Sequence, residues 1–337
     1  MIIHTAFIGD VVLATPLIAK VRDTWPGAAI SFLTTKTAAP ILENNPALTE
    51  ILVYDKKGSD RGIKGFRRIV RRIREKRFDL ALIPHRYLRS ALLAWLAHIP
   101  QRTGYDLWPV RLFYTSLVPY QKNIPEADRL LGFAPGSGQK NYPVALFPGP
   151  EADQKAAELL GETDGKALIL VAPGSRWFTK CWPLQYYSEL LSRLRERSDA
   201  VIALIGGKEE AALPLPAGEG ILDLRGKTTL PELAAVISRA AILVTNDSAP
   251  VHIASAFPGV QIHVFFGPTV KEQGFAPRSA NAVIYEAKGL SCRPCGRHGG
   301  KRCKAGHFRC MMDIKPELVL KRIENSLRER YDAEKNA

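Results

Sequence analysis

The chain has 337 residues, 46% of them hydrophobic, and its 47 lysines and arginines exceed its 33 acidic residues to give a net charge of +14. This length and apolar content exclude a disordered chain and favour two packed domains. The positive charge favours an anionic partner, which leaves nucleic acids, acidic lipid surfaces and phosphorylated substrates open. No run approaches about 18 consecutive apolar residues, and the N-terminus lacks the pattern of a signal peptide, so we expect a cytoplasmic protein.

In the first half of the chain, short apolar runs alternate with stretches of helical period, the pattern of a parallel sheet with crossover helices. We predict strands at residues 2–7, 29–33, 51–54, 80–83 and 102–105. Helices are expected after Asp10, around Ala38, and over residues 65–77 and 88–97. Residues 1–150 should therefore form one Rossmann-like α/β domain.

Proline and glycine crowd residues 132–150, which indicates a connector. Beyond it the alternation restarts, with strands expected at 167–172, 200–205, 242–245, 261–266 and 282–285 and helices at 184–197, 231–240 and 250–256. A last helix from 316 to about 330 either belongs to this second Rossmann-like domain, residues 151–337, or packs back on the first. Two such domains facing each other leave a cleft at the carboxyl ends of their strands, where ligands of open α/β sheets bind.

The strand at 167–172 leads into Pro173-Gly174-Ser175 and then through Lys180 to a helix. Backbone N–H groups, a hydroxyl and an ammonium can converge there on phosphate oxygens, which fits a diphosphate. The spacing is not that of a Walker loop. An ordinary loop with Ser175 as a cap and Lys180 in solvent explains the segment as well.

A second strand-to-helix junction reads Thr245-Asn-Asp-Ser-Ala-Pro-Val-His252. Asp247 or Ser248 can cap the helix, and Pro250 suits its first turn. The polar groups exceed what one cap needs, which favours a binding site, although His252 by itself is more typical of a packed histidine.

Gly9-Asp10 closes the first strand and opens the first helix. Asp10 is well suited to be an N-cap. The carboxyl end of a strand is also where a carboxylate can reach a substrate hydroxyl as a general base. Both roles stay open at this point.

These segments, Gly9–Pro16, Ala172–Ser175 with Thr179–Pro183, and Thr245–Ala254, together resemble the family-nine glycosyltransferases, the ADP-heptose:lipopolysaccharide heptosyltransferases, and the type II branch looks similar. The resemblance implies the glycosyltransferase B architecture, with an N-terminal acceptor domain and a C-terminal ADP-sugar domain. It also implies inversion at the anomeric carbon without a required metal ion.

Carried over by motif, the resemblance implies that Asp10 is the general base and that Lys180 stabilises the leaving diphosphate. It assigns the following residues to the donor site: Gly9, Gly174, Ser175, Glu210, Asp247, Ser248 and His252. Glu209 is an equal candidate for the ribose contact of Glu210. The chain departs from the family pattern at Ala249, where glycine is usual, and in its first strand, which lacks the usual Lys-Ile-Leu-x-x-Arg opening.

Residues 56–77 carry eleven lysines and arginines, with apolar residues at near-helical spacing, so one side of a helix packs while the arginines face outward. An anionic lipid surface or a phosphorylated lipopolysaccharide core fits this charge and the resemblance. We expect a peripheral location at the inner face of the cytoplasmic membrane, and acceptor contacts from Arg61 and Lys64. No nucleic-acid recognition motif accompanies the arginines.

Four of the five cysteines fall within nineteen residues, at Cys292, Cys295, Cys303 and Cys310. A cytoplasmic compartment keeps thiols reduced, so a disulfide framework is not expected. Four thiolates among several glycines can hold a structural zinc ion. A reduced cysteine-rich loop over the donor site explains the cluster equally well.

Overall fold

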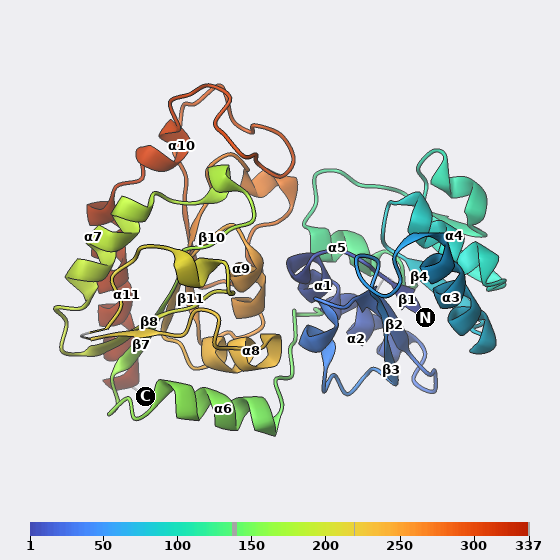
Figure 1. The fold of residues 1–337 in the computed structure, drawn as a ribbon, viewed down its shortest axis with the longest axis horizontal. Helices are drawn as coiled ribbons and strands as arrows, with labels where there is room; N and C mark the ends of the chain where they lie inside the picture. Colours follow the sequence, from blue (N-terminus) through green and yellow to red (C-terminus); the bar gives the residue numbers. More distant parts are fainter. Residues whose placement is uncertain (137–139, 219, 336–337) are drawn as a thin grey trace. The chain divides into compact units, whose positions relative to one another are not determined.

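The computed structural model describes residues 1–136, 140–218 and 220–335 and divides into two compact units, Met1–Phe147 and Pro148–Ala337 (Figure 1). The division falls in the segment predicted to be a connector, of which residues 137–139 lie outside the described residues. Among the described residues, no helix combines the length and apolar content needed to span a bilayer.

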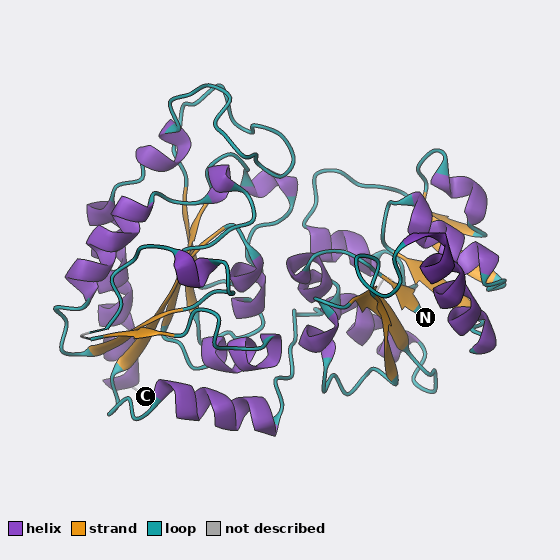
Figure 2. Ribbon diagram, viewed as in Figure 1, coloured by secondary structure: helices purple, strands orange, loops and turns teal. Residues whose placement is uncertain are grey.

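The first unit is built on a six-stranded parallel sheet of order β3-β2-β1-β4-β5-β6. Its strands are β1 (Ile2–Ile3), β2 (Ser31–Thr35), β3 (Glu50–Tyr54), β4 (Leu80–Ile83), β5 (Gln101–Tyr105) and β6 (Ser116–Val118). Its helices are α1 (Ile8–Leu13), α2 (Thr15–Thr24), α3 (Gly62–Glu75), α4 (Leu88–Leu96) and α5 (Glu126–Leu131), with 3₁₀ turns η1 (Ala39–Leu42) and η2 (Val110–Phe113). Figure 2 shows helices on both sides of this sheet, so the predicted parallel α/β class is confirmed for this unit.

The predicted strand at 2–7 is too long, because α1 already begins at Ile8 and β1 ends at Ile3. The strand expected at 29–33 lies two residues later, where Thr34 and Thr35 are buried despite their hydroxyls. The short, exposed edge strand β6 was not predicted, because it has no run of buried apolar residues that would signal it.

The second unit repeats the design with a parallel sheet of order β12-β11-β10-β7-β8-β9. Its strands are β7 (Ala167–Ala172), β8 (Ala200–Leu204), β9 (Ile221–Asp223), β10 (Ile242–Asn246), β11 (Gln261–Phe265) and β12 (Ala282–Tyr285). Its helices are α6 (Pro150–Leu160), α7 (Leu184–Leu194), α8 (Leu230–Ser238), α9 (Ala249–Ala254), α10 (Arg309–Met312) and α11 (Pro316–Lys335), with 3₁₀ turns η3 (Phe178–Lys180), η4 (Glu210–Ala212) and η5 (Lys271–Gln273). The predicted second parallel α/β sheet is thereby confirmed, whereas α6, β9 and α10 were not predicted.

The core of the second unit centres on Trp182, which is fully buried and stacks on Phe265 with ring centroids 4.5 Å apart. The indole Nε1 donates to the Ile314 carbonyl oxygen at 2.9 Å, just before α11 begins. Val319 and Ile323 of α11 belong to the same core, and α11 packs on α7. The last helix therefore packs within the second unit.

Candidate functional site

The second unit has its topological switch point between β7 and β10. These strands are hydrogen-bonded neighbours, with Thr245 beside Ala172, and the sheet extends from them in opposite directions. The loops that follow them therefore diverge and leave a crevice at the carboxyl edge, the usual ligand position in an open α/β sheet. The segment predicted to bind a diphosphate and the second predicted binding segment, Thr245–His252, both lie at this point.

Lys180 and Asp247 form an ion pair at this crevice, with Nζ 2.5 Å from Oδ2 and the side chains 13% and 4% exposed. The same carboxylate oxygen accepts a hydrogen bond of 2.7 Å from Thr269 Oγ1. An ammonium has three donors, so the pair fixes Lys180 and leaves hydrogen-bonding capacity for a bound anion. Thr269 was not singled out from the sequence, although it follows the neighbouring strand β11.

Asn246 links the two loops. Its Nδ2 donates to the Pro173 carbonyl oxygen at 2.7 Å, and its Oδ1 accepts from Trp182 N at 2.9 Å and from Tyr187 Oη at 3.1 Å. The buried amide is satisfied on both sides, which holds the Lys180 loop in register with the end of β10.

Gly174 lies under the side chain of Glu210. A Cβ atom at residue 174 would clash with the Glu210 side chain, and Glu210 Oε2 accepts a hydrogen bond of 2.7 Å from Gly207 N. Glu209 is exposed, and among the described residues the carboxylate that lies against Gly174 is that of Glu210. Ser175 Oγ accepts a hydrogen bond from Trp177 N at 3.5 Å, which is a turn contact.

Ser248 is the N-cap residue of α9, but its hydroxyl donates back to the Asn246 carbonyl oxygen at 3.3 Å and makes no capping bond. His252 is buried, and its Nδ1 has no hydrogen-bond partner among the described residues. Burial lowers the pKa of His252 to about 4, against an opposing effect of Asp247, so the ring is neutral near pH 7. A neutral ring next to the ion pair suits a packing or hydrogen-bonding role.

In the first unit, Asp10 is the third residue of α1 and not its N-cap, so the predicted N-cap role is wrong. Its Oδ2 accepts a hydrogen bond of 3.3 Å from Phe7 N, which satisfies a free backbone donor at the start of the helix. Gly9 is the preceding helical residue. Both follow β1, so Asp10 lies at the carboxyl edge of the sheet.

Two histidines and a lysine also lie at this edge, because His4 follows β1, Lys56 follows β3 and His85 follows β4. The buried His4 ring meets His85 edge-to-face at 5.6 Å, and His85 Nδ1 lies 2.7 Å from Ser90 Oγ. Burial lowers the pKa of His4 to about 4 and that of His85 to about 2, so both rings are neutral. Lys56 Nζ donates to the Thr5 carbonyl oxygen at 2.8 Å.

The two predicted acceptor contacts, Arg61 and Lys64, are exposed at the start of α3, which follows β3. They therefore lie on the same edge of the sheet as Asp10. The sequence suggested this pair through its charge and its place at the start of the helix, and its acceptor contact stays a prediction. Lys56, His4 and His85 were not singled out, because only the strand order brings them to this edge.

The cysteine-rich segment packs against the loop that carries Lys180. Gly300 N donates to Thr179 Oγ1 at 2.7 Å, and Thr179 N donates to the Gly300 carbonyl oxygen at 3.1 Å, one residue from Lys180. Cys295, Cys303 and Cys310 line a cavity of about 90 Å³ between this segment and Thr179. All five cysteines are free thiols.

The four cysteines predicted to bind zinc are not arranged as a metal centre. Cys295 Sγ donates to the Cys292 carbonyl oxygen at 2.9 Å, and Cys292 Sγ lies 3.8 Å from His307 Nε2. Throughout residues 1–136, 140–218 and 220–335, no three His, Cys, Asp or Glu side chains are placed to share an ion. The zinc site stays a prediction.

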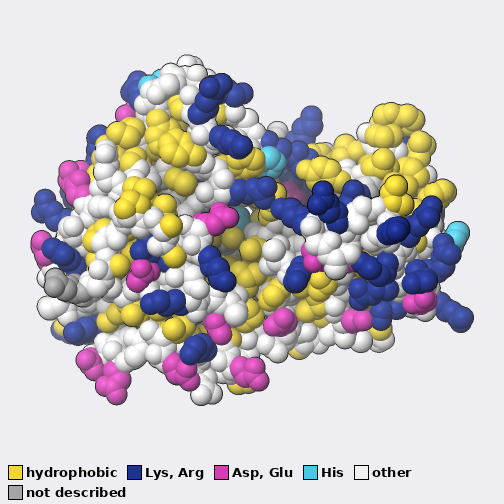
Figure 3. Space-filling view, viewed as in Figure 1, with side chains coloured by type: hydrophobic (Ala, Val, Ile, Leu, Met, Phe, Trp, Pro, Cys, Tyr) yellow, Lys and Arg dark blue, Asp and Glu magenta, His cyan; other side chains and the backbone are white. Residues whose placement is uncertain are grey.

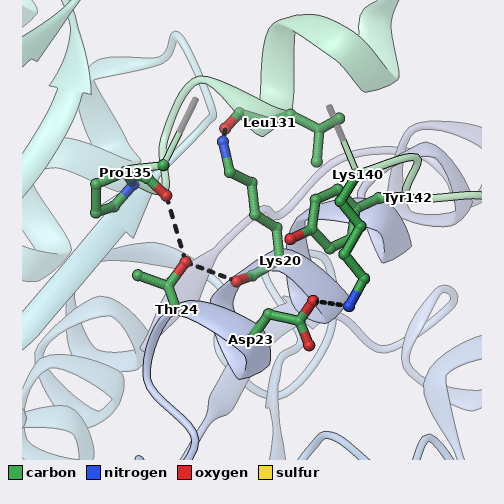
Figure 4. A pocket seen from close by; sticks show the side chains of 8 residues that line it. Lys20, Asp23, Thr24, Leu131, Pro135, Lys140 and Tyr142 are labelled. Atoms are coloured by element: carbon green, nitrogen blue, oxygen red, sulfur yellow. Dashed lines mark hydrogen bonds and ion pairs between the residues drawn. The ribbon is translucent and has the colours of Figure 1, made fainter. Parts of the chain in front are cut away.

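A larger cavity, of about 200 Å³, lies in the first unit between α2, α5 and the connector (Figure 4). Lys20 Nζ donates to the Leu131 carbonyl oxygen at 3.0 Å, and Lys140 forms an ion pair with Asp23. Its charged side chains are thus satisfied by an ion pair and a backbone carbonyl, and the cavity lies at the C-terminal end of α2, away from the carboxyl edge. We interpret it as a gap between packed elements and not as a ligand site.

Comparison with known proteins identifies the family of the chain. A model of glycosyltransferase family 9 (heptosyltransferase) matches residues 66–305. Lipopolysaccharide heptosyltransferase 3 of Escherichia coli is 27% identical over 78% of this chain and 84% of its own. Lipooligosaccharide heptosyltransferase 2 of Haemophilus influenzae is 26% identical over 97% of this chain and 99% of its own.

Among solved structures, that of E. coli ADP-heptose lps heptosyltransferase II aligns with a TM-score of 0.79 and 21% identity, covering 98% of both chains. At this identity the likeness concerns the fold.

Proposed function

The chain belongs to glycosyltransferase family 9, and we propose that it transfers heptose from ADP-L-glycero-D-manno-heptose to the inner core of lipopolysaccharide, in the manner of a heptosyltransferase II. The observation that carries the proposal is the Lys180–Asp247–Thr269 cluster at the switch point of the second unit. A buried, fixed ammonium beside a glycine loop is suited to a nucleoside diphosphate.

In the proposed reaction, an acceptor hydroxyl bound by the first unit attacks the anomeric carbon of the heptose. The bond from this carbon to the diphosphate oxygen breaks, and its electron pair leaves with ADP. Asp10 accepts the hydroxyl proton, a role that general-base carboxylates at strand ends can fill. Attack from the side opposite to the leaving group inverts the anomeric configuration.

Lys180 stabilises the charge that grows on the departing ADP. Because Asp247 already holds the ammonium in place, little reorganisation is needed as the charge develops. We propose that the reaction needs no metal ion, since Lys180 supplies the positive charge, with Gly174, Ser175, Ser248 and His252 lining the donor site. Glu210 is our candidate for the ribose contact.

For the acceptor, we propose that Arg61 and Lys64 bind anionic groups of the lipopolysaccharide core. Both are exposed on the edge that carries Asp10. Such an acceptor is anchored in a bilayer, so the enzyme would act at the inner face of the cytoplasmic membrane without contact to nucleic acid.

Release of ADP tests the proposal. We expect purified protein to release ADP from ADP-heptose only when the core acceptor is present. Asp10→Asn should lower kcat by about 1,000-fold while ADP binding by calorimetry stays within twofold of wild type. A variant that retains wild-type turnover would exclude Asp10 as the base.

A panel of other nucleotide sugars distinguishes the alternatives. Faster turnover with another sugar would assign a related transferase, and ADP binding without any acceptor-dependent release would assign a non-catalytic binding protein. Similarity to both type 2 and type 3 relatives makes the acceptor part of the same test. Metal analysis of reduced protein separately tests the cysteine site.

A further inference from the structure

The outer side of α4 is apolar, unlike that of an ordinary surface helix. Leu88, Leu92 and Trp95 follow one another at spacings of four and three residues and so share one side of the helix. Leu88 and Trp95 are 44% and 46% exposed. A surface helix normally turns polar residues outward, so two large apolar side chains left this exposed are unusual.

The segment after β5 extends this surface. Its 3₁₀ turn η2 contacts α4, and Phe113 of η2 meets Trp95 edge-to-face with ring centroids 5.5 Å apart. Trp108 is 77% exposed and Leu112 is 65% exposed. We call these six residues the apolar face: Leu88, Leu92, Trp95, Trp108, Leu112 and Phe113.

A row of arginines borders the apolar face. Arg67, Arg71 and Arg74 are exposed and share one side of α3, at spacings of four and three residues. Helix α3 packs against α4, and Arg74 Nη2 donates to the Leu96 carbonyl oxygen at 2.6 Å. This contact places the arginine row beside α4.

Figure 3 shows the combination on one surface. Hydrophobic side chains gather at the upper right, over the turquoise segment that follows β5 in Figure 1, and lysines and arginines lie below them. Exposed apolar surface rimmed by polar groups marks an interaction site. Tryptophan and leucine beside basic residues are the composition of proteins that lie in the headgroup region of a bilayer.

We propose that the apolar face and the arginine row dock the protein on an anionic phospholipid bilayer, with Trp108 and Leu112 inserted among the headgroups. The inference rests on the proposed function, because that function requires a lipid-anchored acceptor. Charge selects this occupant: three arginines attract an anionic surface, each with an appreciable contribution near the membrane. A protein partner with a predominantly apolar interface would not need them.

One end of the apolar face lies at the edge of the sheet that carries Asp10. Leu88 begins α4 directly after the loop that follows β4, and Trp108 follows β5, so this end of the apolar face lies at the carboxyl edge of the sheet. Asp10 lies at the same edge. Docking here brings the acceptor side of the first unit to the membrane.

Vesicle binding tests the proposal without any substrate. Wild-type protein should cosediment with vesicles of phosphatidylethanolamine and phosphatidylglycerol and bind phosphatidylcholine vesicles much more weakly. The double variant Trp108→Ser, Leu112→Gln should bind the anionic vesicles at least about tenfold more weakly, since burying one large apolar side chain is worth a factor of about ten or more. Leu318→Gln, an exposed leucine on α11, is the matched apolar control and should bind like wild type.

Reversing the arginine row tests the charge contribution. Arg67→Glu with Arg71→Glu should abolish the preference for anionic vesicles, whereas Arg193→Glu with Arg195→Glu on exposed positions at the end of α7 makes the same change in net charge and should keep it. Melting curves and sedimentation of each variant check folding and self-association.

The proposal is refuted if wild-type protein does not bind anionic vesicles, or if the apolar-face variant binds them as tightly as wild type. It is also refuted if wild-type protein forms a dimer that the apolar-face variant disrupts, because the apolar face would then be a subunit interface. Turnover of a soluble acceptor that lacks its lipid anchor tests the proposed heptose transfer independently of membrane docking. If the apolar-face variant loses vesicle binding but turns over this acceptor like wild type, both stand. If neither protein turns over any acceptor, the proposed function fails whatever the vesicles show.

Discussion

Lys180→Ala separates the structural and the catalytic role of the ion pair. In the structure, Asp247 is 4% exposed and receives Lys180 Nζ at 2.5 Å and Thr269 Oγ1 at 2.7 Å. Removing the lysine leaves a buried carboxylate with one neutral hydrogen-bond donor. Such a charge is costly, because neither solvent nor a cation balances it.

The expected loss of stability follows from this burial. Breaking a buried ion pair by removing one partner costs about 3–5 kcal/mol. The Thr269 hydrogen bond remains and Lys180 is 13% exposed, so we expect the lower end, about 3 kcal/mol, or roughly 6–12 °C in melting temperature for a domain of this size. The loss of transition-state stabilisation should lower kcat by about 100- to 1,000-fold as well.

The double variant Lys180→Ala, Asp247→Asn divides these effects. A neutral amide needs no cation, so most of the lost stability should return while kcat stays low. Urea unfolding and ADP release of the wild type, both single variants and the double variant form the complete cycle. If the double variant regains turnover along with stability, Lys180 acts only by neutralising Asp247, and its role at the leaving group is refuted.

Three further changes probe the fold and the site. Glu210→Ala should weaken ADP binding about tenfold, as expected for one lost hydrogen bond to a charged group. Glu209→Ala should leave ADP binding unchanged in calorimetry, and equal effects of the two variants would refute Glu210 as the ribose contact. Burial lowers the pKa of His263 from 6.5 to about 4. Its contribution to stability is therefore complete above about pH 6.5 and falls as the pH drops toward 4, because only the unfolded state binds the proton in that range. His263→Gln should flatten the loss of unfolding free energy between pH 7 and 5, and an unchanged slope would contradict this. Trp182→Ala should destabilise the protein by about 3–5 kcal/mol through the cavity left beside Phe265, and a loss below 1 kcal/mol in urea unfolding would be inconsistent with a core position.

The cysteine-rich segment gains a structural explanation from its contacts. The paired hydrogen bonds between Gly300 and Thr179 tie it to the loop that carries Lys180, and Arg293 Nη2 donates to the carbonyl oxygens of Phe266 and Thr269, each at 2.9 Å. The segment thus links the loops that follow β7 and β11. These contacts give the segment a structural role with or without a bound ion, so both interpretations of the cysteine cluster stay predictions.

Several features were predictable from the sequence alone. Ala167–Ala172 and Leu80–Ile83 were predicted with their observed bounds, because buried parallel strands are continuous apolar runs. The edge strand Ala282–Tyr285 was also predicted with its observed bounds, from its own short apolar run. The candidate residues Asp10, Ser175 and Asp247 were singled out partly because they follow predicted strands, and every strand of a parallel sheet ends at the same edge.

Strand order, by contrast, is set by pairing between distant residues, and no local pattern encodes it. Only the tertiary structure shows that β7 and β10 are neighbours, which brings Lys180 to Asp247 across 67 residues of chain and places Asn246 between their loops. The choice of Glu210 over Glu209 depends on the path of a loop past Gly174. The apolar side of α4 likewise reads as core in sequence, and only the packing of the first unit shows that this side is left exposed.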